Sequence, residues 1–311
     1  MPSPRQFRIG SRKSPLSIKQ TSAILTNLQQ KSPNINFEIV PMSTGGDRNK
    51  DAPLLSLGRG TFVKEIELGL LNGDIDIAVH SAKDLPPDIP DGLTIAATTE
   101  RVDPRDALIS QNALSFKELP VRARIGTSSP RRRAQVLAMR SDLDVLPIRG
   151  NVGTRIDRVR SDAYDAVVLA AAGLIRLGMG HNITEFMDPE ICTPEVGQGT
   201  LAIEARSDDT DVLELLNEIN HDLTIKMLRA ERAFLLALEG GCTVPVTAFA
   251  RMENGDMNID AMAALPDGSR IFRTKSIGDF NDPEGTGRSV ACKLLNAGAQ
   301  KIIDLGSTKG K

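Results

Sequence analysis

The sequence of 311 residues predicts an α/β fold class, with two doubly wound domains and a small α+β domain toward the C-terminal end. Three observations predict it. Strand and helix signals alternate from residue 7 to about residue 100, and they alternate again from about residue 125 to residue 179. After residue 242, strand-like segments follow one another directly, separated by hairpin turns. With 40% hydrophobic and 25% charged residues, the composition is that of a globular protein and not of a disordered or fibrous one.

Local signals place the elements of the two α/β domains. Serine followed by proline caps a helix at Ser14-Pro15 and again in Thr127 to Pro130, because proline suits the first helical turn. Polar residues and a proline at Arg101 to Arg105 mark the crossover between the domains. The predicted strands are 7–10, 37–42, 75–79, 93–97, one ending at residue 125, 145–148 and 164–170, and the predicted helices include 14–30, 61–71 and 171–179. This alternation favours mostly parallel sheets that are covered on both faces.

The C-terminal part begins with helices and continues with antiparallel strands. Helical signals run from Leu213 to Leu238 with a break near His221-Asp222, and the double glycine Gly240-Gly241 ends the second helix. Asn254-Gly255 and Asp267-Gly268 predict two hairpin turns. The turns separate strands 244–252, 257–264 and 270–276, and a closing helix follows at about 287–305. We therefore expect a three-stranded antiparallel sheet with helices beside it.

Composition disfavours several classes of function. The net charge of −2 gives no global attraction to nucleic acid or to an anionic membrane, and one tyrosine and no tryptophan leave few rings for stacking bases. No segment approaches the ~20 apolar residues that a membrane span needs. Three scattered histidines predict no metal site. Three widely spaced cysteines, together with a start that lacks an apolar stretch, favour a cytoplasmic location.

Arginines concentrate between residues 122 and 160. This stretch holds ten arginines and three aspartates, and neither lysine nor glutamate. One interpretation is a solvated helix face, although such faces usually mix lysine with glutamate. The other interpretation is an anion site, because several of these arginines follow strand ends, where open α/β sheets bind ligands.

Three turns would supply such an anion site. IGTSSPRRR offers hydroxyls, helix N–H groups and guanidiniums at one strand end, PIRGNVGTR offers Arg149 and Arg155, and GSRKSP offers Arg12 and Ser14. Guanidiniums bind carboxylates and phosphates through paired N–H groups. We therefore expect a polyanion with several carboxylates, held in a cleft between the two α/β domains. Nucleotide use is not supported, because the chain has neither a G-x-G-x-x-G motif after a strand nor a complete P-loop.

Two further motifs could carry chemistry. Lys83 and Asp84 follow a predicted strand in VHSAKDLP. They form either a surface pair in a loop or a site in which a carboxylate stays ionised among cations and stabilises a developing cation. Cys242 lies in EGGCTVP. A buried structural cysteine is the common case, but the two preceding glycines suit an exposed loop whose thiol can be attached covalently.

Seven motifs, taken in order, resemble the porphobilinogen deaminase family: RIGSRKSPL, AVHSAKDLP, IGTSSPRRRAQ, RGNVGTR, AAAGLIRLG, EVGQG and EGGCTVP. The resemblance implies a transferase of tetrapyrrole and haem biosynthesis, a hydroxymethylbilane synthase. Such an enzyme joins four porphobilinogens head to tail, releases ammonia at each step and then frees linear hydroxymethylbilane by hydrolysis. The resemblance also implies two domains like those of periplasmic binding proteins, and a third domain in which a dipyrromethane cofactor is linked to Cys242 by a thioether.

The resemblance further implies domain boundaries and residue roles. Domain 1 would comprise 1–100 and 196–218, domain 2 would comprise 101–195, and domain 3 would comprise 219–311. Asp84 resembles the catalytic aspartate of the family. The implied cofactor-binding residues are Cys242, Arg12, Ser14, Lys83, Thr127, Ser129, Arg131, Arg132 and Arg155, and the implied substrate-binding residues are Arg149, Arg176, Phe62 and Gln198. Porphobilinogen carries an acetate and a propionate, which suits an arginine-lined site. The family also suggests a monomer, and we expect no metal, nucleic acid or membrane partner.

Two other functions compete with this one. A non-enzymatic, two-domain anion-binding protein would need export and no reactive cysteine, so the absence of a signal-like start and the presence of GGC count against it. An RNA-binding protein could use the run of arginines, but the low aromatic content and the acidic balance of the whole chain disfavour it.

Overall fold

The structure is a computed structural model that describes residues 6–45, 60, 63–238 and 244–308, with the side chains of 305–308 left aside. The chain divides into two compact units, Met1–Val102 with Thr200–Ile225 and Asp103–Gly199 with Lys226–Lys311. Each unit has its own hydrophobic core. The chain passes between the units near residues 102, 199 and 225.

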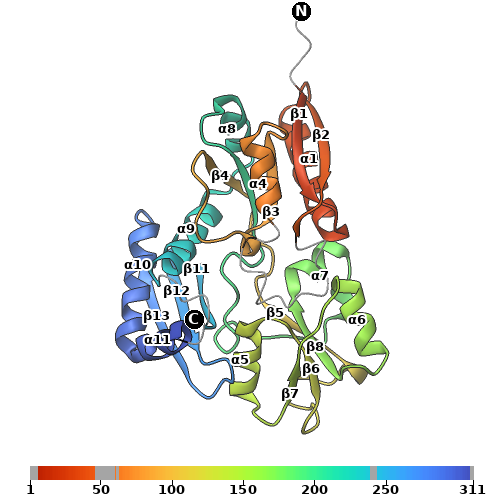
Figure 1. The fold of residues 1–311 in the computed structure, drawn as a ribbon, viewed down its shortest axis with the longest axis vertical. Coiled ribbons are helices and arrows are strands. Elements are labelled where there is room, and N and C mark those ends of the chain that lie inside the picture. The colour runs from red at the N-terminus through yellow and green to blue at the C-terminus, as the bar shows by residue number, and fades with distance from the viewer. Residues whose placement is uncertain (1–5, 46–59, 61–62, 239–243, 309–311) are drawn as a thin grey trace, which may run out of the picture. The chain divides into compact units, whose positions relative to one another are not determined.

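The first unit is a five-stranded sheet with helices on both faces (Figure 1). Its strand order is β2 (Asn36–Met42), β1 (Gln6–Arg12), β3 (Ile77–Ser81), β10 (Leu201–Arg206) and β4 (Leu93–Thr98), and its helices are α1 (Pro15–Lys31), α4 (Lys64–Leu71) and α8 (Thr210–Asn217). Strand β1 runs parallel to β2 and β3, whereas β10 runs antiparallel to β3 and β4. Leu28 of α1 and Val212 of α8 pack on one face, and Ile66 and Leu70 of α4 pack on the other.

The second unit contains a sheet of the same design. Its strand order is β7 (Asp144–Leu146), β6 (Arg124–Gly126), β8 (Ala166–Ala170), β5 (Asp106–Ser110) and β9 (Glu185–Phe186), and its helices are α5 (Pro130–Met139), α6 (Val152–Arg160) and α7 (Ala171–Leu177). Strand β6 runs parallel to β7 and β8, whereas β5 runs antiparallel to β8 and β9. Val136 of α5 packs on one face, and Ile156 of α6 and Leu174 of α7 pack on the other.

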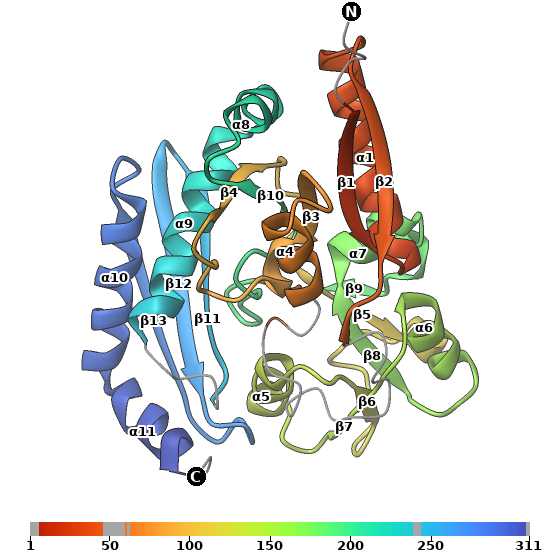
Figure 2. The same cartoon turned by 45° about the horizontal axis from the view of Figure 1, so that its top comes forward.

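The second unit also holds a three-stranded antiparallel sheet (Figure 2). It consists of β11 (Val246–Glu253), β12 (Asp256–Ala264) and β13 (Ile271–Gly278), and beside it lie α9 (Asp222–Ala237), α10 (Pro283–Leu294), a π-helical turn (Leu295–Ala299) and α11 (Gln300–Thr308). Strand β12 alternates its side chains between two cores. Ile259 faces the helices α9 to α11, whereas Met262 faces Ala134 of α5. This alternation seats the small sheet against α5.

The predicted fold class is confirmed, with differences in detail. The sheets are mixed and not mostly parallel, because β10 and β5 enter each sheet antiparallel to their neighbours. These two strands and β9 were not predicted. Helix α4 begins at Lys64, α9 begins at Asp222, and the closing helix begins at Pro283 and is interrupted by the π-helical turn. The predicted domain boundaries stay a prediction.

The two five-stranded sheets share an ion pair at the same place. Arg8 at the start of β1 donates from Nε to Oδ2 of Asp76 over 3.2 Å, and Arg124 at the start of β6 donates from Nε to Oδ2 of Asp165 over 3.1 Å. Each aspartate directly precedes the central parallel strand, β3 or β8, and each also accepts the backbone N–H of its arginine. The chain thus uses one frame twice, and the tripeptide Arg-Ile-Gly occurs in both strands, at 8–10 in β1 and at 124–126 in β6.

Candidate functional site

In the first unit, the candidate residues lie where β1 and β3 end. Because these strands are parallel and paired, their carboxyl ends lie at the same sheet edge. Strand β1 ends at Arg12, and β3 leads into a 3-10 turn that contains Lys83 and Asp84. Nη1 of Arg12 lies 4.0 Å from Oδ2 of Asp84, whose side chain is 37% exposed. The structure therefore places a partly exposed carboxylate beside a cation, an arrangement that both interpretations of this motif allow.

Polar contacts, one of them fully buried, hold these two turns. Ser14 caps α1 by accepting the backbone N–H of Ser17 over 3.2 Å. Gln20 of α1 donates from Nε2 to Oγ of Ser81 over 3.1 Å, directly before the turn that carries Asp84. One residue earlier, Nε2 of the buried His80 lies 3.1 Å from Oε2 of Glu204 on β10. The helix and the neighbouring strand thus both fix the start of this turn.

In the second unit, hydroxyls line the turn between β6 and α5. Oγ1 of Thr127 accepts the backbone N–H of Ser129 over 3.3 Å, and Oγ of Ser129 caps α5 by accepting the backbone N–H of Arg132 over 3.4 Å. An oxygen that accepts in this way can still donate its hydroxyl proton to an anion. Both hydroxyls can therefore still donate a proton, and the predicted role of this turn in binding a carboxylate stays a prediction.

Arg131 and Arg132 are buried and share one buried carboxylate. Asp106, which is 0% exposed at the start of β5, accepts from Nη1 of Arg131 over 2.8 Å and from Nε of Arg132 over 2.9 Å. Nε2 of Gln198 donates to the same carboxylate over 2.9 Å, and Oε1 of Gln198 accepts from Nη2 of Arg132 over 3.2 Å. Burial alone would raise the pKa of the Asp106 carboxyl, but the two guanidinium charges hold that pKa well below its usual range.

Asp106 was missed by the sequence analysis. The available signal was an acidic residue at the start of the apolar segment DALIS, directly after the predicted crossover. A charge that enters a buried strand requires a partner, because an unpaired buried carboxylate is costly. The sequence alone does not show which of ten nearby arginines supplies that partner.

Arg155 and Arg176 are desolvated cations of a different kind. Each donates to a backbone carbonyl, Arg155 to Gly150 over 2.8 Å and Arg176 to Gly199 over 2.7 Å, and neither forms an ion pair with a described carboxylate. Burial, followed by repulsion from the charges of Arg132 and Arg149, lowers the pKa of Arg155 to about 10. Burial lowers the pKa of Arg176 to about 10 as well. A bound anion beside either guanidinium would raise its pKa again, because it would supply the missing counter-charge.

Most other arginines of the cluster have structural partners. The ion pairs are Arg122 with Asp144 (3.6 Å), Arg124 with Asp165 (2.9 Å), Arg140 with Asp142 (2.6 Å) and Arg160 with Asp157 (3.6 Å). The run of arginines is therefore neither a plain solvated face nor a single binding surface. It divides into arginines that are neutralised within the fold and arginines that are not.

Two predicted residues, Phe62 and Cys242, lie outside the described residues. Of the described cysteines, Cys292 is exposed and Cys192 is buried. Sγ of Cys192 lies 3.3 Å from Oδ2 of Asp106, and burial together with that negative charge raises the pKa of this thiol to about 12. Cys192 is therefore a neutral structural thiol and is unsuited to covalent attachment.

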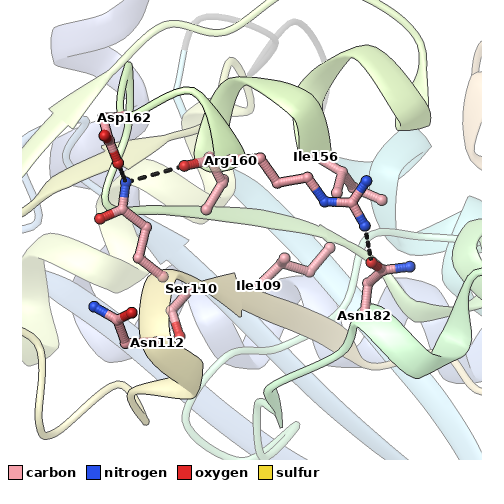
Figure 3. Close-up of a pocket in the computed structure, with 9 residues that line it drawn as sticks. Ile109, Ser110, Asn112, Ile156, Arg160, Asp162 and Asn182 are labelled. Carbon is pink, nitrogen blue, oxygen red and sulfur yellow. Dashed lines mark hydrogen bonds between the residues drawn. The ribbon is translucent and has the colours of Figure 1, made fainter.

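One pocket of the second unit lies away from these turns (Figure 3). Its volume is about 420 Å³, and its lining includes Ser110, Arg160, Asp162 and Asn182. Because Ser110 pairs with Ala166, the pocket sits at the opposite end of β8 from the turn that follows residue 170. Arg160 donates from Nη2 to Oδ1 of Asn182 over 2.9 Å, so these two polar side chains of the pocket bind each other. This pocket is separate from the candidate site.

Two features of the described residues concern metal binding and membrane spanning. Within them, no group of three or more His, Cys, Asp or Glu side chains is arranged to hold a metal ion. No helix in the same part of the chain is long and apolar enough to cross a membrane.

Comparison with known proteins identifies the family. The model of the porphobilinogen deaminase dipyromethane cofactor binding domain matches residues 7–214, and that of the porphobilinogen deaminase C-terminal domain matches residues 225–296. The chain is 46% identical to the porphobilinogen deaminase of Halalkalibacterium halodurans over 303 residues, which are 96% of this chain and 97% of that one. It is 45% identical to the porphobilinogen deaminase of Bacillus subtilis, over 96% of each chain. The periplasmic aliphatic sulphonate binding protein SsuA from Escherichia coli matches at 13% identity with a TM-score of 0.42, over 78% of this chain and 73% of that one. The chain belongs to the porphobilinogen deaminase family.

Proposed function

We propose that the protein is a hydroxymethylbilane synthase that condenses four porphobilinogens and releases linear hydroxymethylbilane. At each condensation the bond between the aminomethyl carbon and its nitrogen breaks, ammonia leaves, and a carbon–carbon bond forms to the unsubstituted α-carbon of a pyrrole, which loses its proton. Water ends the sequence by releasing the product. The substrate and the growing chain are polycarboxylates, so the site must hold anions while it stabilises a cation.

The observation that carries this proposal is the pair of desolvated arginines in the second unit. Arg155 and Arg176 have lowered pKa values, about 10 in each case, and no carboxylate partner among the described residues. A fold gains no stability from holding such cations without counter-charges, and functional sites are where such costs are retained. A carboxylate ligand supplies the missing counter-charge.

The residues present fit a dipyrromethane, which carries several carboxylates. When bound, this group supplies the primer to which the first substrate is added. We propose Arg12, Ser14, Lys83, Thr127, Ser129, Arg131, Arg132 and Arg155 as the groups that hold it, Cys242 as its attachment point, and Arg149, Arg176, Phe62 and Gln198 as substrate-binding residues. The turn hydroxyls donate to carboxylate oxygens and the guanidiniums balance their charge.

Arg131 and Arg132 differ in how many of their N–H groups are already used within the fold. The contacts with Asp106, Glu195 and the carbonyl of Thr193 use four of the five N–H groups of Arg131. The contacts of Arg132 use three of its five N–H groups. We propose that Arg132 is the direct carboxylate ligand of the two, and that Arg131 contributes chiefly through the charge balance around Asp106.

Asp84 is proposed as the catalytic residue. Loss of ammonia from porphobilinogen leaves an azafulvenium-like cation, and a carboxylate beside it lowers the energy of the transition state. An ion pair at about 4 Å is worth roughly 4 kcal/mol at an effective dielectric constant near 20, or about a thousandfold in rate. Nη1 of Arg12, 4.0 Å from Oδ2 of Asp84, places a positive charge beside this carboxylate before the substrate arrives.

Turnover of porphobilinogen tests the proposal. The purified protein should release four molecules of ammonia for each linear hydroxymethylbilane, which closes to a porphyrinogen in acid and can be oxidised and read by its absorbance. A protein that binds porphobilinogen but releases no ammonia would instead be a binding protein. A cytoplasmic location and a monomeric state are also proposed here, and size-exclusion chromatography with light scattering tests the second.

A further inference from the structure

Two hydroxyl groups hold the backbone directly before Arg149. Oγ of Ser128 donates to the carbonyl of Ile148 over 2.7 Å and accepts the backbone N–H of Ile148 over 3.0 Å. The hydroxyl of Tyr164 donates to the carbonyl of Pro147 over 2.7 Å. Both hydroxyls come from other elements, Ser128 from the turn after β6 and Tyr164 from the segment before β8. From the sequence, the Ser128 hydroxyl was expected among the anion-binding groups of the turn IGTSSPRRR, and Tyr164 was given no role in the site.

These bonds replace a sheet ladder that has come to an end. The register of β6 and β7 stops at Gly126 and Leu146, and one more backbone bond joins Thr127 to Leu146 over 2.9 Å. Beyond it, Pro147 has no N–H to donate. The hydroxyl of Ser128 then binds both the N–H and the carbonyl of Ile148. It thus supplies the two hydrogen bonds that a residue of a neighbouring strand would otherwise make.

The chain on the other side of Arg149 is fixed as well. Gly150 has a φ of +111°, and a Cβ there would lie 2.7 Å from Cγ2 of Thr154, so glycine is needed at this turn. Asn151 then caps α6 by accepting the backbone N–H of Thr154 over 2.9 Å. Arg149 thus extends from a short segment that is anchored at both ends.

We infer that Ser128 and Tyr164 are positioning residues that orient the Arg149 guanidinium toward a carboxylate of the pyrrole substrate. The inference rests on the proposed function, because the substrate-binding role of Arg149 is itself proposed. A guanidinium recognises a carboxylate through two parallel N–H bonds, so small displacements of its backbone weaken recognition. Ile148, which is 1% exposed, keeps its own place in the core, and the two hydroxyls decide where the next residue points.

Two single variants, the double variant that combines them, and two control variants test this role. Ser128→Ala and Tyr164→Phe each remove a single hydroxyl without adding bulk, and Ser128→Thr retains the hydroxyl. Ser161→Ala is the matched control, because that exposed hydroxyl also donates to a backbone carbonyl of the same unit, that of Arg158 over 3.3 Å. The readouts are amide hydrogen exchange at Ile148 and the KM and kcat for porphobilinogen, with urea unfolding to verify folding.

We expect Ser128→Ala to speed exchange at Ile148 by about tenfold or more, because its N–H loses its acceptor. Each single variant should raise KM about fivefold, the worth of one hydrogen bond, and leave kcat within about twofold. The double variant, Ser128→Ala with Tyr164→Phe, should raise KM by more than the product of the two single effects. In each single variant the remaining hydroxyl still holds residues 147–148. Ser128→Thr and Ser161→Ala should behave like the parent protein.

Arg149→Leu separates the two ways in which this inference can fail. A raised KM in Arg149→Leu, together with an unchanged KM in Ser128→Ala and Tyr164→Phe despite faster exchange at Ile148, would overturn the positioning role and leave the role of Arg149 intact. An unchanged KM and unimpaired chain growth in Arg149→Leu would overturn the proposed role of Arg149 itself.

Discussion

The two five-stranded sheets share strand order, strand directions and an arginine–aspartate pair, but they differ in the charges at their strand ends. Counting eight residues along the chain from the shared aspartates, Asp84 follows Asp76 in the first sheet, and Gly173 takes the equivalent place in the second. Asp106 pairs with Ala170, and Leu201 of the first sheet pairs with the equivalent Ser81. The first sheet therefore presents a carboxylate at its edge, and the second buries one beneath its arginines.

This difference shows how one frame supports two tasks. Under the proposed function, the first unit stabilises a cation with its partly exposed Asp84 carboxylate. The second can bind anions, because Asp106 neutralises part of the charge of Arg131 and Arg132 while Arg155 and Arg176 remain without carboxylate partners among the described residues. The following predictions test that division, beginning with the largest expected effect.

Asp84→Asn should nearly abolish turnover and leave the protein folded. Removing a charge that acts on the transition state should lower kcat by about a thousandfold, with little change in urea unfolding. Asp88→Asn, an exposed aspartate four residues along the same chain segment, is the matched control and should retain full activity. Near-normal turnover in Asp84→Asn would remove the carboxylate of the first unit from the mechanism.

Asp106→Asn should mainly destabilise the second unit. Two buried guanidiniums would lose their counter-charge, and breaking such a pair costs about 3–5 kcal/mol of unfolding free energy. The pKa of Asp106 lies below its unfolded value of about 3.9, so this stability is present above about pH 4 and is lost as the pH falls toward the folded pKa.

The pH dependence provides the measurement for Asp106. Urea unfolding of the parent protein should show a decline in stability below about pH 4, and Asp106→Asn should lack that part of the decline. Asp142→Asn, which removes the half-buried partner of Arg140, should show a much smaller change. Equal effects of the two substitutions would mean that the buried carboxylate has no special place in the second sheet.

Arg155→Gln should separate stability from binding. Its guanidinium is desolvated and repelled by Arg132 and Arg149, so its removal from a Cys242→Ser protein should leave the unfolding free energy unchanged or raise it by up to about 1 kcal/mol. With Cys242 intact, Arg155→Gln should either raise the KM for porphobilinogen by about tenfold or more, or lower the fraction of protein that carries the cofactor by a similar factor. Arg158→Gln, on the same helix and exposed, should change neither quantity. A clear loss of stability in the Cys242→Ser background would indicate that Arg155 is structural.

The shared frame should give the smallest effects. Asp76→Asn and Asp165→Asn should each cost about 1 kcal/mol or less, because the arginine of each pair, Arg8 or Arg124, is partly exposed and screened by solvent. Asp76 should cost the more of the two, since it also accepts from Nη2 of Arg206 over 3.1 Å. Thermal unfolding measures both, and a larger loss in Asp165→Asn would contradict the equivalence of the two frames.

Local signals in the sequence predicted the elements that have strong boundaries. The Ser-Pro caps of α1 and α5 and the two hairpin turns of the small sheet were predicted where the structure has them. Strands β5 and β10 were missed because each is short and carries a charge. Each also comes directly after a point where the chain passes from one unit to the other, so its pairing partners lie far away in the sequence. Pairing between distant segments decides those strands, and no local pattern contains it.

In the candidate site too, local features were predictable from the sequence and long-range contacts were not. The arginine-rich turns were evident in the sequence, whereas the division between paired and unpaired guanidiniums required contacts such as Asp106 with Arg131, which are 25 residues apart. The roles of Ser128 and Tyr164 also depend on contacts across the sheet edge. Residue type thus indicated an anionic ligand. The contacts in the fold were needed to show which guanidiniums are already paired with carboxylates.

The mass of the intact protein tests the central claim most directly. If the chain holds a dipyrromethane primer on Cys242, the purified protein should exceed its sequence mass by that group, and Cys242→Ser should show the sequence mass alone. A parent protein without the added mass, yet able to convert porphobilinogen, would contradict the account, as would a Cys242→Ser protein that keeps the adduct.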